Sequence, residues 1–115
     1  MTEFIVVLIT CAKIQEAKKI ANVLVDSRLA ACVNIIPGIH SIFRWEGKID
    51  KAKEVLLIVK TKKSVFSKLV KKAKSIHSYD VPEIIALPIV SGEPSYLDWL
   101  NQSVQTSRIS SGRIS

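Results

Sequence analysis

Apolar and polar positions along the chain change period several times, and each change marks a predicted element. Residues 3–10 are almost continuously β-branched and aliphatic, which is typical of a strand buried on both faces. From about residue 13 to residue 29 the apolar residues recur at helical spacing. The same spacing returns from Ser64 to Ile76, where lysines occupy the opposite side. The pattern therefore predicts two amphipathic helices, the first of them following a buried strand.

Between these helices the pattern predicts a hairpin. Residues 31–36 indicate a second strand, Pro37-Gly38 interrupts it, and residues 39–45 are extended again. We therefore expect one long strand with a bulge or a bend. Residues 46–48 are typical of a turn, and residues 55–59 predict the third strand.

After the second helix, Asp80-Val81-Pro82 breaks the helical pattern, because the residue before a proline avoids the helical region. Residues 83–90 predict a fourth strand, which must be an edge strand or bulged to accept Pro88. A short helix then begins near residues 92–95. Its apolar positions include Tyr96 and Trp99, which we expect in the core.

The order β-α-β-β-α-β with a short C-terminal helix predicts an α+β, ferredoxin-like fold. Residues 1–105 form the single domain, and residues 106–115 form a polar C-terminal tail. Right-handed crossovers place both main helices on one face of the sheet. The other face is left bare, yet the first, third and fourth strands are apolar at almost every position rather than alternating. We therefore predict that copies of the chain associate through that face.

Composition and charge narrow the function. The chain has 115 residues, of which 48% are apolar and 23% charged, and a net charge of +7. Many of its lysines lie between residues 60 and 74, which suits either a solvated helix face or an attraction to anions. RNA binding is disfavoured, because the third strand offers no aromatic residues for base stacking. The apolar run at residues 4–9 is too short for a membrane span or a secretory signal, so we expect a cytoplasmic protein without membrane insertion.

Several phrases of the sequence occur together in one order: residues 29–38, Phe43-Arg44-Trp45 with Glu46-Gly47-Lys48, residues 77–85, residues 87–89 and residues 96–100. With these phrases the chain resembles the CutA divalent-cation-tolerance family over about residues 4–102. The resemblance implies a homotrimer, a link to copper and other divalent cations, and no enzymatic activity. It implies no cofactor that folding requires.

Three residues are candidate metal ligands. The fourth strand of a ferredoxin-like sheet is antiparallel to the first, so Cys11, His77 and Glu83 are expected at one end of the sheet. Thiolate, imidazole and carboxylate together suit copper or zinc. Cys32 is expected at the opposite end, so we predict no disulfide between the two cysteines.

The family resemblance places the ligands slightly differently. It implies ligand positions at Ile9, Ile76 and Glu83, and neither isoleucine can bind a metal. Cys11 lies two residues from Ile9, on the same face of the strand. We therefore expect copper binding that is weaker than in relatives with all three ligands, and that depends mainly on the Cys11 thiol.

Each candidate also has a purely structural interpretation. The cysteines suit small buried positions, His77 could satisfy backbone groups, and Glu83 could be a subunit contact. Trp45, at the hairpin tip, is expected to anchor an interface.

A second function stays open beside metal handling. A trimer of this architecture, similar to the PII signalling proteins, would suit a signalling or anchoring module that binds a small anion or a partner protein between subunits. No nucleophile, metalloprotease or nucleotide-binding motif is present in the sequence, so catalysis is not expected.

Overall fold

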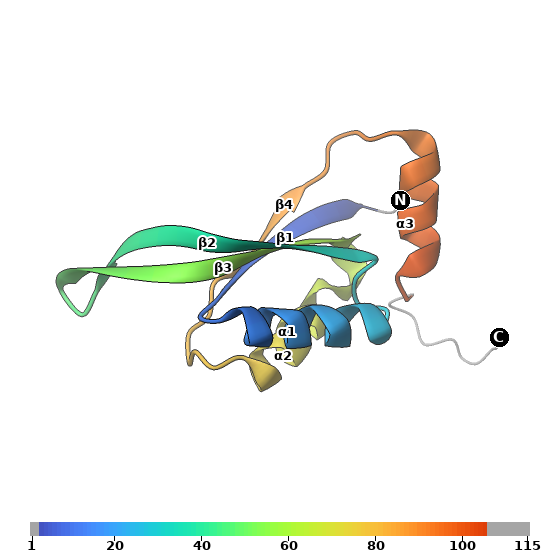
Figure 1. Cartoon of the computed structure of the whole chain (residues 1–115). Helices are drawn as coiled ribbons and strands as arrows, with labels where there is room; N and C mark the ends of the chain where they lie inside the picture. The colour runs from blue at the N-terminus through green and yellow to red at the C-terminus, as the bar shows by residue number, and fades with distance from the viewer. Residues whose placement is uncertain (1–2, 106–115) are drawn as a thin grey trace.

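The computed structural model describes residues 3–105. Within them, four strands form one antiparallel sheet in the order β2-β3-β1-β4 (Figure 1). The strands are β1 (Phe4–Cys11), β2 (Cys32–Trp45), β3 (Lys48–Lys62) and β4 (Ile84–Pro88). The helices are α1 (Ile14–Asp26), α2 (Phe66–Ile76), which follows the short 3-10 turn η1 (Lys63–Val65), and α3 (Pro94–Ser103). The predicted α+β, ferredoxin-like order is confirmed.

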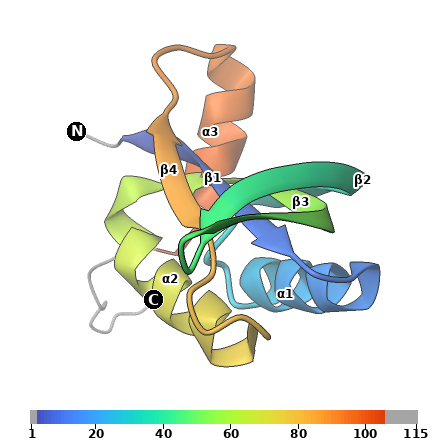
Figure 2. The same cartoon turned by 90° about the vertical axis from the view of Figure 1, so that its left-hand side faces the viewer.

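The core lies between the sheet and helices α1 and α2. Alternate side chains of β1 point toward these helices, and Val7 and Ile9 are completely buried. Leu57 and Val59 do the same from β3, which pairs with β1 in antiparallel register. Figure 2 shows α1 and α2 together on one side of the sheet. The placement of both helices on one face is the one that right-handed crossovers predicted.

The β2–β3 hairpin is longer than predicted and extends beyond the core (Figure 1). The expected bulge is confirmed as a shift of register between Ile36 and Ile39, where Gly38 has a φ of +74°. The predicted third strand began at Val55, whereas β3 begins at Lys48. Residues 48–53 are mostly exposed, because they lie in the part of the hairpin that extends beyond the core. Most of them are charged, so they lack the apolar pattern that indicates a strand.

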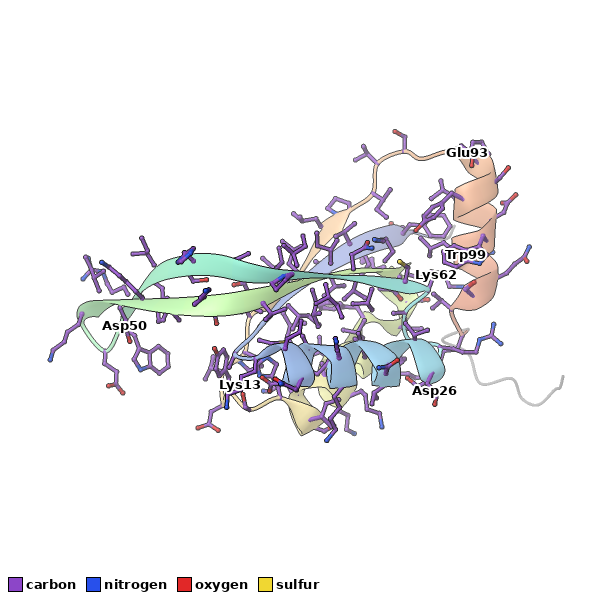
Figure 3. All side chains as sticks on the ribbon, in the orientation of Figure 1. Lys13, Asp26, Asp50, Lys62, Glu93 and Trp99 are labelled. Atoms are coloured by element: carbon purple, nitrogen blue, oxygen red, sulfur yellow. The ribbon has the colours of Figure 1, made fainter. Side chains whose placement is uncertain are left out.

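Helix α3 lies on the side of the sheet opposite α1 and α2, so one end of the face predicted to be bare is covered (Figure 2). Lys62 donates to the carbonyl and side-chain oxygens of Asn101, and Arg28 donates to the carbonyl oxygen of Gln102. Both cations meet the C-terminal turn of the helix, where free carbonyls favour positive charge. Figure 3 shows Lys62 beside this helix.

The prediction that Tyr96 and Trp99 belong to the core is wrong. Their residues are 42% and 45% exposed, and of the residues in α3 only Leu100 is buried. The two rings pack against each other instead, with centroids 5.3 Å apart. Helix α3 therefore buries Leu100 and partly buries Leu97, and its two aromatic residues remain on the surface.

The tail at residues 106–115 lies outside the described residues. In the part of the chain that is described, no helix is both long and apolar enough to cross a membrane.

Candidate functional site

A hollow of about 680 Å³ lies where β1 ends and the hairpin projects past the sheet. Its wall combines four segments of the chain, because the hairpin and the connection from α2 to β4 converge on Thr10. The lining residues are Thr10 of β1; Ser41, Ile42, Phe43 and Trp45 of β2; Asp50 and Glu54 of β3; and Tyr79, Asp80, Val81 and Glu83. Thr10 alternates with Ile9 and Cys11 along β1, so this hollow is on the face away from α1 and α2.

The hollow is acidic although the chain is basic. Four of its lining residues are carboxylates, namely Asp50, Glu54, Asp80 and Glu83, and the lining described by the structure contains no lysine or arginine. The whole chain carries a net charge of +7. Carboxylates collected in a concave, partly apolar wall concentrate a negative potential there. We call this site the acidic hollow; it favours cations.

Glu54 is the most buried of the four carboxylates in the hollow, with 8% of its surface accessible, whereas the other three are exposed. The Tyr79 hydroxyl donates to Glu54 Oε2 at 2.8 Å. Burial, followed by the hydrogen bond and the charge of Glu54, raises the pKa of Tyr79 to about 12. Tyr79 therefore remains a neutral donor under ordinary conditions and holds the carboxylate in place.

His77 lies behind the hollow, with its side chain fully buried. Its Nε2 is 2.7 Å from the carbonyl oxygen of Thr10, and its Nδ1 is 3.0 Å from the backbone nitrogen of Tyr79. A carbonyl only accepts and an N–H only donates, so Nε2 carries the proton and Nδ1 is the acceptor. Both ring nitrogens are therefore bonded to the backbone. This is the alternative role expected for His77, in which it satisfies backbone groups instead of binding a metal.

Glu16 of α1 holds the same connection from the helix side. It accepts hydrogen bonds from the backbone N–H and hydroxyl of Ser78 and from the backbone N–H of Ala12. Burial raises the pKa of Glu16, but the hydrogen bonds from Ser78, the nearby His77 and the hydrogen bond from Ala12 together lower it overall. Its carboxylate is 3.7 Å from His77 Nδ1.

Cys11 faces the helices and is completely buried. Burial, followed by the negative charges of Glu16 and Glu54, raises the pKa of its thiol to about 12. A thiol must lose its proton to bind a metal, so this environment opposes a dominant role for Cys11 in copper binding. Cys11 and Cys32 are both free, as predicted.

The three predicted ligands lie near one end of the sheet but in different environments. Cys11 is in the core, His77 is bonded to the backbone, and Glu83 lines the acidic hollow. Residues 3–105 contain no group of three His, Cys, Asp or Glu side chains placed to hold one metal ion. A single chain therefore does not assemble the predicted set, and Ile9, one of the two isoleucines at the implied ligand positions, is completely buried.

Sequence reasoning missed Glu54 and its pairing with Tyr79. One signal was present: Glu54 directly precedes the apolar run of β3, so a charged side chain stands where the strand enters the core. The long-range register that brings this strand beside Thr10 was needed to see its meaning.

The comparisons with known proteins agree on one family. The model of the family described as "CutA1 divalent ion tolerance protein" matches residues 5–103. The "Divalent-cation tolerance protein CutA" of Thermus thermophilus is 52% identical over 98 residues, which are 85% of this chain and 95% of that protein. "Protein CutA, chloroplastic" of Arabidopsis thaliana is 48% identical over 101 residues, which are 88% of this chain but 56% of that protein.

Solved structures give the same result. The divalent cation tolerance protein (Cut A1) of Thermus thermophilus superposes with a TM-score of 0.87 at 50% identity, covering 91% of this chain and 100% of that one. The structure named "Periplasmic divalent cation tolerance protein CutA" of Archaeoglobus fulgidus gives a TM-score of 0.84 at 45% identity, with the same two coverages.

Proposed function

The chain belongs to the CutA1 divalent ion tolerance family, and we propose that it acts as a homotrimer that binds copper and other divalent cations weakly. A role in divalent cation tolerance follows from the family. In our proposal the chain contributes to this tolerance by binding cations rather than by catalysis. It acts in the cytoplasm, which cell fractionation would test.

The observation that carries the proposal is the acidic hollow, with Glu83 in its wall. Glu83 is the residue that both stands at a ligand position implied by the resemblance and lines a cation-favouring surface. Carboxylate oxygens bind divalent cations, and at a given site Cu²⁺ is bound more tightly than the other first-row divalent ions. With fewer than three protein ligands from one chain, water completes the coordination shell, so binding is weak.

The apolar open face supports the homotrimer. Ile85 and Leu87 of β4 point away from α1 and α2 and are 49% and 51% exposed. Strand β4 is also an edge of the sheet, with one side of its backbone unpaired. A contiguous apolar surface with an open strand edge favours association with another copy. The number three is taken from the family resemblance.

A small anion is not favoured in this hollow, because its described lining has four carboxylates and no basic residue. The lysines of α2 lie elsewhere and need only solvent.

Calorimetry with copper tests the proposal, using Glu83→Gln, Cys11→Ser and, as a matched control, Asp26→Asn. Asp26 lies at the end of α1, far from the hairpin that carries Asp50 (Figure 3). We expect Glu83→Gln to weaken copper binding about tenfold, equivalent to roughly 1.4 kcal/mol, while the other two variants stay near wild type. Native mass spectrometry with and without copper gives the subunit count and the metal stoichiometry. Copper affinity unchanged in Glu83→Gln, or a stable monomer at micromolar concentration, would overturn the proposal.

A further inference from the structure

We propose that the acidic hollow also binds a primary ammonium group carried on an apolar organic body, with Glu54 as its anchor. The first observation is an incompletely paired buried carboxylate. Glu54 is 8% exposed and lines the hollow. Its Oε2 accepts from Tyr79, whereas its Oε1 has no hydrogen-bond or ion-pair partner among the residues that the structure describes.

A buried carboxylate held by one neutral hydroxyl is poorly compensated. Burial of a charge is costly unless the charge is paired, and a hydroxyl supplies no countercharge. Among residues 3–105, Glu3 pairs with Lys63 and Glu16 lies near the neutral His77, but no cationic side chain pairs with Glu54. A cation that enters the hollow and reaches Oε1 would supply the countercharge that residues 3–105 do not.

The rest of the wall favours an organic cation over a bare metal ion at this position. Ile42, Phe43, Trp45 and Val81 contribute apolar surface, and all four are substantially exposed. The aromatic rings of Phe43 and Trp45 attract a cation through their faces and pack against an apolar body. A bare metal ion at Glu54 would find few protein ligands, because residues 3–105 contain no group of three His, Cys, Asp or Glu side chains placed to hold one metal ion.

The size of the hollow fits this class of ligand. Its volume of about 680 Å³ lies within the roughly 300–1,000 Å³ that is usual for small-molecule sites. An ammonium has three N–H donors, and Glu54 with the Thr10 and Ser41 side chains in the same wall offers oxygen acceptors. The chemistry recognised is therefore that of an arylalkyl or alkyl primary amine.

Titration calorimetry with 2-phenylethylamine tests the inference, with 2-phenylethanol as the uncharged probe of nearly equal shape. The wild-type protein is expected to bind the amine saturably, and at least about tenfold more tightly than the alcohol. Glu54→Gln keeps the size of the side chain and an acceptor for Tyr79, and we expect it to weaken amine binding at least about tenfold. Asp26→Asn, at the end of α1 and far from the hairpin, serves as the control and should change amine affinity less than about threefold.

Equal affinity for the amine and the alcohol in wild-type protein would overturn the inference, and this comparison requires no variant to fold. Unchanged amine affinity in a folded Glu54→Gln would also overturn it. A second copy of the chain could supply the ammonium instead, from a lysine. A carbodiimide cross-link between Glu54 and a lysine of another subunit would establish that occupant and overturn the small-molecule site. Copper binding tests Glu83 separately, so either proposal can fail alone.

Discussion

The two faces of the sheet are built from the same strands but differ in what completes them. On the face toward α1 and α2, Leu57 and Val59 are completely buried by other parts of the chain. On the opposite face, Ile85 and Leu87 are about half exposed, although they are equally apolar. Apolar side chains on this sheet are therefore not all core residues. Those on the open face remain accessible to a partner surface in the described part of the chain.

The same contrast holds for two carboxylates near the end of β1. Glu16, on the helix side, accepts hydrogen bonds from Ser78 and Ala12. Glu54, on the open side, has one described partner, Tyr79. The covered side satisfies its polar groups internally, whereas the open side leaves acceptor capacity for something else. Three predictions test this difference, beginning with the largest effect.

Truncation of the core should cost the most. Leu57→Ala leaves a cavity in a completely buried site, and we expect a loss of about 3 kcal/mol in the free energy of unfolding. Leu87→Ala removes a half-exposed side chain and should cost about 1 kcal/mol or less in the folding of the subunit. Denaturant titrations of both variants give the comparison.

The open-face variant should reveal itself through assembly instead. Light scattering on dilution is expected to show that Leu87→Ala dissociates at a higher protein concentration than Leu57→Ala does. If Leu87→Ala lost as much folding stability as Leu57→Ala and assembled normally, the distinction between the two faces would not hold.

The second prediction removes the one described partner of Glu54. Tyr79→Phe deletes the hydroxyl that donates to Oε2, and leaves a buried carboxylate without a described hydrogen bond. We expect a loss of about 1–3 kcal/mol in the free energy of unfolding, the usual cost of an unsatisfied buried group. Tyr96→Phe is the matched control, because Tyr96 is 42% exposed. Equal stability of the two variants would show that Glu54 does not depend on Tyr79.

Prediction from sequence succeeded where the evidence was local. Helical spacing predicted α1 and α2, and a continuous apolar run predicted β1; the structure contains all three. Each of these patterns reflects burial against neighbouring elements. The pattern failed at Tyr96 and Trp99, because helical spacing predicts a common face but not whether anything covers it. It failed also for residues 48–53, which are extended without a buried face.

The site was harder to predict than the fold. The sequence indicated that Cys11 and Glu83 approach the same end of the sheet, but one residue of alternation separates Thr10, in the hollow, from Cys11, in the core. Glu54 enters the hollow only through the register of β3 with β1. Such placements depend on strand pairing over long sequence distances, which no local pattern contains.

The smallest effect is expected on the covered side, at Glu16. Burial raises the pKa of Glu16, but the hydrogen bonds from Ser78, the nearby His77 and the hydrogen bond from Ala12 together lower it in the folded chain. A lowered folded-state pKa contributes stability above the unfolded pKa of about 4.3, and this contribution is lost as the pH falls through the folded value. Glu16→Gln should therefore cost about 1 kcal/mol or less in the free energy of unfolding at pH 7. The gap between variant and wild type should then narrow steadily below about pH 4.

Thermal or denaturant unfolding from pH 7 to pH 2.5 or so measures this gap. Glu3→Gln is the control, because Glu3 pairs with Lys63 on the surface, where the side chains are 57% and 70% exposed. An exposed pair of this kind contributes little, so its variant should follow wild type across the whole range. A gap for Glu16→Gln that stays constant with pH would mean that the charge of Glu16 does not hold the connection at Ser78. In that case packing alone would stabilise the connection at Ser78, as it stabilises the core around Leu57.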